Sequence, residues 1–192
     1  LARLRGVVTA ATEAFDAYNY TRALEVTETF FWEFCDDYLE LVKDRSYGDP
    51  ADPDTASALA ALALSLNVQL RLLAPFLPFV TEEVWSWWQD GSVHRAAWPA
   101  ASELAGVAAD DDEVLTAAAS ALRLIRKAKS ENKLSMRTEL PAVTLNGPAA
   151  PIGAVELAAG DVAAAGRVQS LSFGMADGES DLTADGTLPQ PG

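Results

Sequence analysis

Residues 70–85 read LRLLAPFLPFVTEEVW, and this stretch shows how the first half of the chain is organised. It closes a strongly apolar helical pattern that runs back to Ala58, with Gln69 and Arg71 as the polar residues of its last five positions. A helix that is apolar around most of its circumference is buried in a folded protein. Pro75 and Pro78 end or kink this helix, and Thr81 opens a shorter one. The stretch therefore predicts a buried helix followed by a corner.

The same helical spacing of apolar residues continues on both sides of this stretch. It covers residues 1–17 and 21–46, with Thr21 as the predicted cap of the second helix, and it returns from Asp110 onward. After Leu140-Pro141 the period changes, so that 142–145 and 168–173 read as strands around an Ala-rich, weakly helical stretch.

These patterns predict a mainly α fold. We expect a helical bundle over residues 1–137 and a small α/β appendage over 138–175. Residues 176–192 are rich in Gly, Asp and Pro and are expected to form a flexible tail.

Length and cysteine usage set the class of protein. A chain of 192 residues is long enough for one domain with a small appendage. It begins at Leu1 in the middle of an amphipathic pattern, which suggests a piece of a longer chain. The apolar run from Ala58 to Val68 is too short to span a bilayer, so no membrane is expected. Cys35 is the only cysteine, which fits a reducing, cytoplasmic protein without disulfides.

The charge of the chain is strongly segregated. A formal net charge of −14 argues against nucleic-acid binding, because phosphate contacts require Lys and Arg. Yet the window 123–137 holds six basic residues and one acid, which leaves −19 for the rest of the chain. A solvated face and a strip that contacts RNA phosphates are about equally good interpretations. The candidate contacts to a nucleic-acid backbone are Arg123, Arg126, Lys129, Lys133 and Arg137.

No catalytic constellation is found in the sequence. His94 is the only histidine and has no metal-ligand spacing to a partner, so no metal site is predicted. Residues 133–137, KLSMR, superficially resemble the K-M-S-K-S signature that contacts ATP in class I aminoacyl-tRNA synthetases. They depart from it at the second, fourth and fifth positions, so we reject them as an ATP site.

Three segments together resemble one family. Residues 32–43, WEFCDDYLELVK, are similar to a helix of valyl-tRNA synthetases, which are class I aminoacyl-tRNA synthetases. Residues 73–85 resemble the L-x-P-F-x-P-F-x-T-E-E-x-W signature that the valine, isoleucine and leucine enzymes share. The GSVH at 91–94, followed by Trp98-Pro99, resembles the segment that comes after this signature. The resemblance covers residues 1–137.

The resemblance implies a helical bundle that binds the anticodon stem-loop of valine tRNA. By residue-wise match, Leu39 would make an apolar contact with a splayed base, and Glu40 would accept a hydrogen bond from an exocyclic amine. Trp32 is expected to contact the RNA or a neighbouring domain. Unpaired loop bases are the usual target of sequence readout in RNA.

The resemblance further implies that this part is not catalytic by itself. ATP and Mg²⁺ would serve the full-length ligase elsewhere, with no cofactor in this part. The expected partners are valine tRNA and the remaining domains of the same synthetase chain, and not DNA. Two alternatives stay open: the same region of an isoleucyl enzyme, and an acidic helical protein-interaction module that does not contact RNA.

Overall fold

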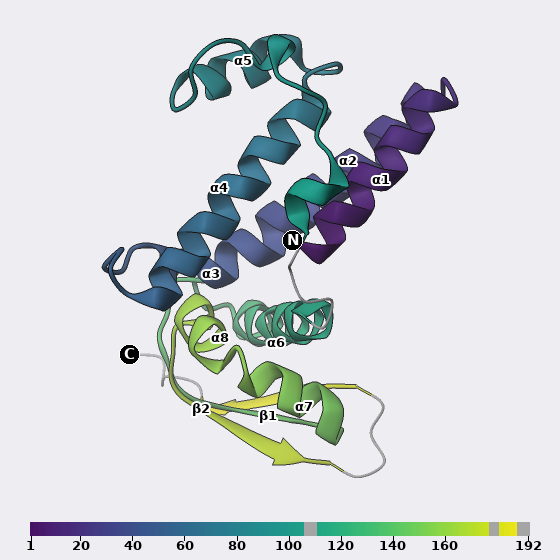
Figure 1. Cartoon of the computed structure of the whole chain (residues 1–192). Coiled ribbons are helices and arrows are strands. Elements are labelled where there is room, and N and C mark those ends of the chain that lie inside the picture. The colour runs from purple at the N-terminus through teal and green to yellow at the C-terminus, as the bar shows by residue number, and fades with distance from the viewer. Residues whose placement is uncertain (106–110, 177–180, 188–192) are drawn as a thin grey trace. The chain divides into compact units, whose positions relative to one another are not determined.

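A computed structural model describes residues 1–105, 111–176 and 181–187, and the chain divides into two compact units (Figure 1). The first unit comprises Leu1–Asp36 and Asp49–Ala109, and the second comprises Asp37–Gly48 and Asp110–Gly192. The first unit is helical, whereas the second combines helices with a small sheet. The predicted fold class, mainly α with a small α/β part, is confirmed.

The first unit is built on a helical hairpin. Helices α1 (Ala2–Asp16) and α2 (Tyr20–Glu33) run side by side, and both contact α4 (Pro53–Leu73) (Figure 1). The predicted cap Thr21 is wrong, because the side chain of Asn19 accepts the hydrogen bond from the Arg22 amide at 3.2 Å. The core of the hairpin and α4 contains Leu4, Val8, Ala11, Phe30, Val68, Leu72 and Leu104.

Helix α4 is the apolar helix expected from the opening stretch. Asp52 caps it by accepting from the Asp54 amide at 2.9 Å, and Pro53 occupies its first turn. Among the described residues it is also the one helix long and apolar enough to cross a membrane. Residues 68–73, at its C-terminal end, are buried in the first unit, whereas Leu59 and Leu66 stay 39% and 38% exposed. The predicted burial around most of the circumference therefore holds only for the C-terminal end. Helix α5 (Pro78–Ser86) follows the predicted corner and places Trp85 beside Leu70 and Val93.

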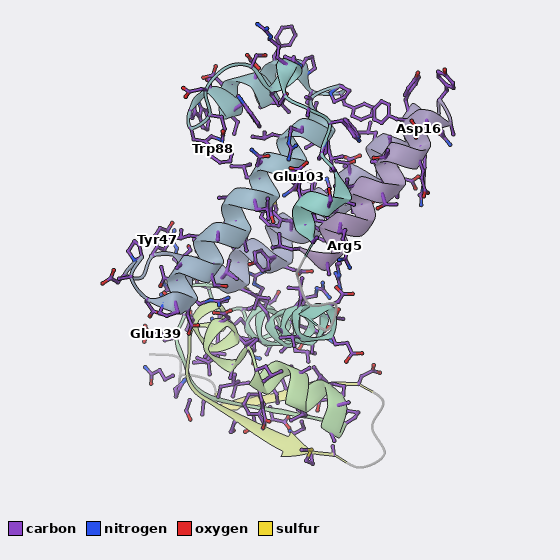
Figure 2. All side chains as sticks on the ribbon, in the orientation of Figure 1. Arg5, Asp16, Tyr47, Trp88, Glu103 and Glu139 are labelled. Atoms are coloured by element: carbon purple, nitrogen blue, oxygen red, sulfur yellow. The ribbon has the colours of Figure 1, made fainter. Side chains whose placement is uncertain are left out.

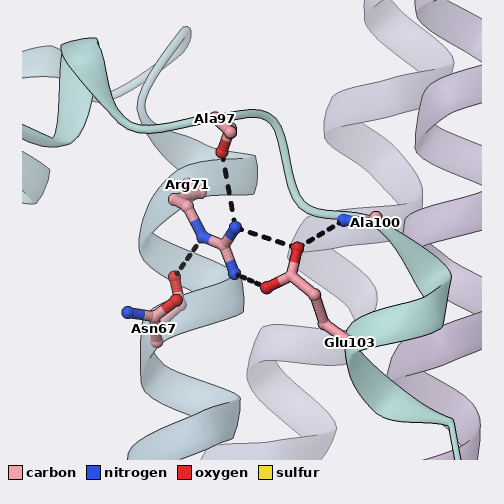
Figure 3. Close-up of polar contacts among 5 residues, drawn as sticks. All are labelled: Asn67, Arg71, Ala97, Ala100 and Glu103. Carbon is pink, nitrogen blue, oxygen red and sulfur yellow. Dashed lines mark hydrogen bonds and ion pairs between the residues drawn. The ribbon is translucent and has the colours of Figure 1, made fainter.

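An ion pair between a buried arginine and a partly exposed glutamate ties α4 to the segment that returns along it (Figure 3). Arg71, with only 9% of its surface exposed, donates to the two carboxylate oxygens of Glu103 at 3.1 and 2.6 Å. It also donates to the carbonyls of Asn67 and Ala97, each at 3.4 Å. Glu103 in turn accepts from the Ala100 amide at 2.7 Å. The hydrogen bond from Arg71 holds the pKa of Glu103 below its ordinary value of 4.5, against the opposing effect of burial.

This lowered pKa predicts an acid-sensitive contribution to stability. Because Glu103 binds its proton less readily when folded than when unfolded, its pair with Arg71 stabilises the chain above about pH 4.5. That contribution is lost as the pH falls through the lowered folded pKa. We expect Glu103→Gln to be less stable than the parent at pH 7, with a difference that narrows below pH 4.5. Urea unfolding from pH 7 to 3 tests this; a constant difference would contradict it.

The second unit is a three-stranded sheet covered by helices. Strand β1 (Leu140–Gly147) lies between β2 (Val168–Met175), which is parallel to it, and β3 (Thr183–Thr187), which is antiparallel. A parallel pair needs a crossover connection, and α7 (Ala149–Glu156) and α8 (Ala159–Gly166) supply it. Helices α3 (Leu39–Ser46) and α6 (Asp111–Glu131) complete this unit. Its core contains Leu41, Leu122, Ile125, Leu140, Val143, Leu145, Ile152, Val155 and Val162.

The predicted boundaries at 137 and 175 need correction. The apolar stripe of α6, with Leu122 and Ile125, is buried in the same core as β1, so this helix belongs with the α/β part. Part of the predicted flexible tail is strand β3, which pairs with β1. Periodicity shows that a helix has an apolar face but does not identify the partner of that face, which explains the misplaced boundary.

Candidate nucleic-acid interface

Leu39 and Glu40 begin helix α3, directly after a π-helical turn at Phe34–Tyr38. Single π-helical turns within helices are frequent at functional sites. The next two residues, Leu41 and Val42, are buried, whereas Leu39 keeps 38% of its surface exposed and Glu40 is partly exposed. The buried pair anchors this turn of α3 and leaves an apolar and an acidic side chain accessible, as a contact with a loop base requires.

Glu40 is held by two basic side chains. Arg126 of α6 donates to its carboxylate at 3.0 Å, and Lys43 lies 3.8 Å from it on α3. The sequence analysis assigned Glu40 to base recognition and Arg126 to phosphate binding, and the structure joins them. A base amine that bonds to Glu40 would share the carboxylate with Arg126. Since a carboxylate has several lone pairs, both contacts are possible at once.

The basic strip of α6 is divided into a neutralised part and an open part. Arg123 donates to Asp37 at 2.5 Å, and Lys127 lies 3.9 Å from Glu131. Lys133 and Arg137 are exposed and have no acidic partner within 4.0 Å among the residues that the structure describes. The cations left for an external anion therefore lie beyond the end of α6.

Lys129, which the sequence analysis assigned to the tRNA backbone, is buried with its ammonium bound inside the protein, which corrects that assignment. Its side chain is 1% exposed, and its ammonium donates to the carbonyls of Met136, Thr138 and Gly166 at 3.2, 2.7 and 2.8 Å. Burial lowers its pKa below the ordinary value of 10.5, and Arg167 and Arg126 lower it further. Its position was readable in the sequence, because it continues the buried stripe of Leu122 and Ile125 at helical spacing.

Trp32 lies on α2 in the first unit and is 55% exposed. Its ring meets Phe31 edge to face, with centroids 5.3 Å apart. Phe30 and Phe34 stack on each other at 6.1 Å and belong to the core of this unit. Trp32 is thus an accessible ring on a rigid support, and its predicted contact with RNA or another domain stays a prediction.

Arg167 is a basic residue of this region that the sequence analysis missed. It follows α8 in the left-handed conformation, with φ 51° and ψ 54°, and donates to the Arg137 carbonyl at 3.3 Å. Like Arg137, it is exposed and has no acidic partner within 4.0 Å in the described part of the chain. No local signal marks it, because it stands alone in an Ala-rich stretch thirty residues after Arg137.

The remaining reactive side chains have structural contacts. A ring nitrogen of His94, Nε2, lies 3.0 Å from the Pro78 carbonyl and donates to it. Burial raises the pKa of the Cys35 thiol above its ordinary value of 9.0, and Asp36 raises it further. A thiol with a raised pKa is a poor nucleophile. Over the described ranges, no group of three or more His, Cys, Asp and Glu residues is placed to hold a metal ion.

Exposed cations gathered at one end of a helix are the electrostatic feature that a nucleic-acid-binding module requires. The chain belongs to the family described as the anticodon-binding domain of tRNA ligase, whose family model matches residues 1–144. It is 53% identical over 193 residues to the valine–tRNA ligase of Salinispora arenicola, covering 92% of this chain and 22% of that protein. The enzyme of Thermobifida fusca is 56% identical over 186 residues, covering 96% and 21%. That of Cutibacterium acnes is 47% identical over 194 residues, covering 100% and 22%.

Proposed function

We propose that this chain is the part of an ATP-dependent valine–tRNA ligase that binds the anticodon stem-loop of valine tRNA. The chain spans about a fifth of the length of the three relatives named above, each of which is called valine–tRNA ligase. The observation that carries the proposal is the exposed Leu39 beside Glu40, held over a buried turn in a chain of the anticodon-binding family.

In this proposal, some residues contact the anticodon bases and others contact the RNA backbone. Leu39 covers the face of a splayed base, and Glu40 accepts from an exocyclic amine while Arg126 fixes the direction of its carboxylate. Lys133 and Arg137 contact backbone phosphates, which position the RNA without reading its sequence. ATP and Mg²⁺ serve the ligation step of the full-length enzyme in the cytoplasm, in parts of the enzyme other than these 192 residues.

Binding measurements with the two most similar tRNAs test this proposal. We expect this chain to bind the anticodon stem-loop RNA of valine tRNA more tightly than that of isoleucine tRNA. Leu39→Ala is expected to weaken valine stem-loop binding by roughly 5- to 30-fold, since a lost apolar contact of this size contributes about 1–2 kcal/mol. The salt dependence should not change, because Leu39 carries no charge. Fluorescence anisotropy at several salt concentrations measures both quantities.

Leu66→Ala is the matched control. Leu66 lies on α4 in the first unit and is also 38% exposed, so the substitution removes the same apolar group from an equally accessible place. The Leu66→Ala variant should bind the valine stem-loop with the same affinity as the parent. A preference for the isoleucine stem-loop would favour the isoleucyl alternative. Absence of binding to either RNA at low salt would favour a protein-interaction module.

A further inference from the structure

A hollow of about 410 Å³ lies within the second unit, lined by α3, the turn after α6 and the end of α8. Its charged lining is Lys43, Arg126, Lys129, Arg137 and Arg167, with the acids Glu40 and Asp44. The lining holds five basic and two acidic residues, so its net charge is positive, whereas the whole chain has 28 acids and 14 bases. We propose that this hollow binds a backbone phosphate of the RNA, with Arg137 and Arg167 as its ligands.

Of the five basic residues in the lining, Arg137 and Arg167 are the two whose charge is neither paired with an acid nor fully used by carbonyls in the described part of the chain. Arg126 and Lys43 share the carboxylate of Glu40, and all three donors of Lys129 are used by carbonyls. The guanidinium groups of Arg137 and Arg167 have no acidic partner within 4.0 Å in the described residues. Asp44, the second acid, lines the same hollow and opposes an anion, so the net potential depends on both arginines.

The buried ammonium of Lys129 fixes the backbone beside the two arginines. The ammonium of Lys129 binds the carbonyls of Met136 and Thr138, which flank Arg137, and that of Gly166, which precedes Arg167. Because these carbonyls are held inward by one buried cation, the turn after α6 and the end of α8 are joined. Arg167 then donates to the Arg137 carbonyl at 3.3 Å. A site assembled in advance loses less entropy when its ligand binds.

The backbone conformation of Arg167 is a second observation. With φ at 51°, it stands where a helix is usually followed by Gly, and a side chain with a Cβ is strained there. Unfavourable backbone conformations of this kind concentrate at binding sites. The fold would accept glycine at 167, whereas Arg167 adds a guanidinium that donates to the Arg137 carbonyl and has further N–H groups for an anion. Two planar guanidinium groups match the oxygens of a phosphate better than single ammonium groups do.

The inference rests on the proposed RNA-binding function and extends it. The matched family model ends at residue 144, whereas Arg167 follows α8 in the α/β part. The α/β part would therefore contribute directly to RNA binding, through one phosphate contact held beside the anticodon-reading helix α3.

Three variants of this chain test the phosphate site: Arg167→Gly, Arg137→Gln and the control Arg95→Gln. The control removes the same charge from an exposed arginine of the first unit that has no acidic partner within 4.0 Å among the described residues. The probe is the anticodon stem-loop RNA of valine tRNA, titrated at several salt concentrations. Each test variant should lower the slope of log affinity against log salt by about 0.7–0.9 relative to the control.

Arg167→Gly separates binding from folding. Because glycine suits the left-handed conformation, its Tm should equal or exceed that of the parent, so a weaker affinity is not a result of unfolding. If both test variants keep the slope of Arg95→Gln while the parent binds, the phosphate site is overturned and the RNA-binding proposal stands. If the parent does not bind the stem-loop, both are overturned. If polyglutamate competes as well as the RNA, an acidic protein segment is the ligand and the phosphate assignment is wrong.

Discussion

Lys129→Met is expected to lower the free energy of unfolding of the second unit by about 2–4 kcal/mol. Methionine fills a similar volume but donates no hydrogen bond, so the carbonyls of Met136, Thr138 and Gly166 lose a shared partner inside the protein. Each buried carbonyl left without a donor costs about 1–3 kcal/mol. Removing a desolvated ammonium offsets part of this cost, since burial already lowers the pKa of Lys129.

Amide hydrogen exchange of β1 and urea unfolding followed by circular dichroism measure this effect. Protection of the β1 amides should fall with the stability of the second unit. Lys127→Met is the matched control, because Lys127 lies on the same helix but is exposed and only weakly paired with Glu131. The control should change stability by less than about 0.5 kcal/mol. An equally small effect for Lys129→Met would show that water satisfies the three carbonyls.

The same substitution connects stability with function. Since Lys129 fixes the backbone on both sides of the proposed phosphate site, its loss should also weaken the contacts of Arg137 and Arg167. Lys129 would thus contribute to the proposed RNA binding by positioning the two arginines, without touching the RNA.

Arg71→Leu is expected to lower the stability of the first unit by about 2–4 kcal/mol. The substitution leaves Glu103 without its bidentate partner and the Ala97 carbonyl without a donor. Removing one member of an ion pair leaves the other charge uncompensated, which costs most where that charge is desolvated. Glu103 is partly exposed, so water recovers part of this loss and the lower half of the range is the better expectation.

Tryptophan fluorescence is a specific readout for this unit. All five tryptophans, Trp32, Trp85, Trp87, Trp88 and Trp98, lie in its two segments. Arg22→Leu is the control, because Arg22 pairs with Glu25 at 2.9 Å on the exposed surface of α2. For that variant, the free energy of unfolding measured by fluorescence should change by less than about 0.5 kcal/mol. Equal shifts for the two variants would mean that Arg71 stabilises the unit no more than a surface pair does.

Tyr47 and Trp88 are two of the accessible aromatic side chains without a proposed role. Tyr47 follows α3 and lines the rim of the hollow, and Trp88 follows α5 (Figure 2). Tyr47 is close enough to the proposed phosphate site to serve as a reporter. Its ring signals should shift in an NMR titration with the stem-loop RNA.

The sequence by itself determined the helices and the family. Apolar spacing and prolines predict α1, α2, α4 and the corner before α5, because these features depend on neighbouring residues only. The motifs at 32–43, 73–85 and 91–99 identified the family that the comparison confirms over residues 1–144. Leu39 and Glu40 were also named from the sequence, and the structure places both on accessible turns of α3.

Tertiary structure alone decided which basic residues remain available. A run of cations in sequence does not reveal that Asp37 and Glu40, from another helix, neutralise Arg123 and Arg126. Pairing between distant segments also placed β3 beside β1 and brought Arg167 to Arg137. The reason is that a local pattern fixes which face of an element is apolar or charged. Which other segment packs against that face depends on the tertiary fold, which brings together residues far apart in the sequence.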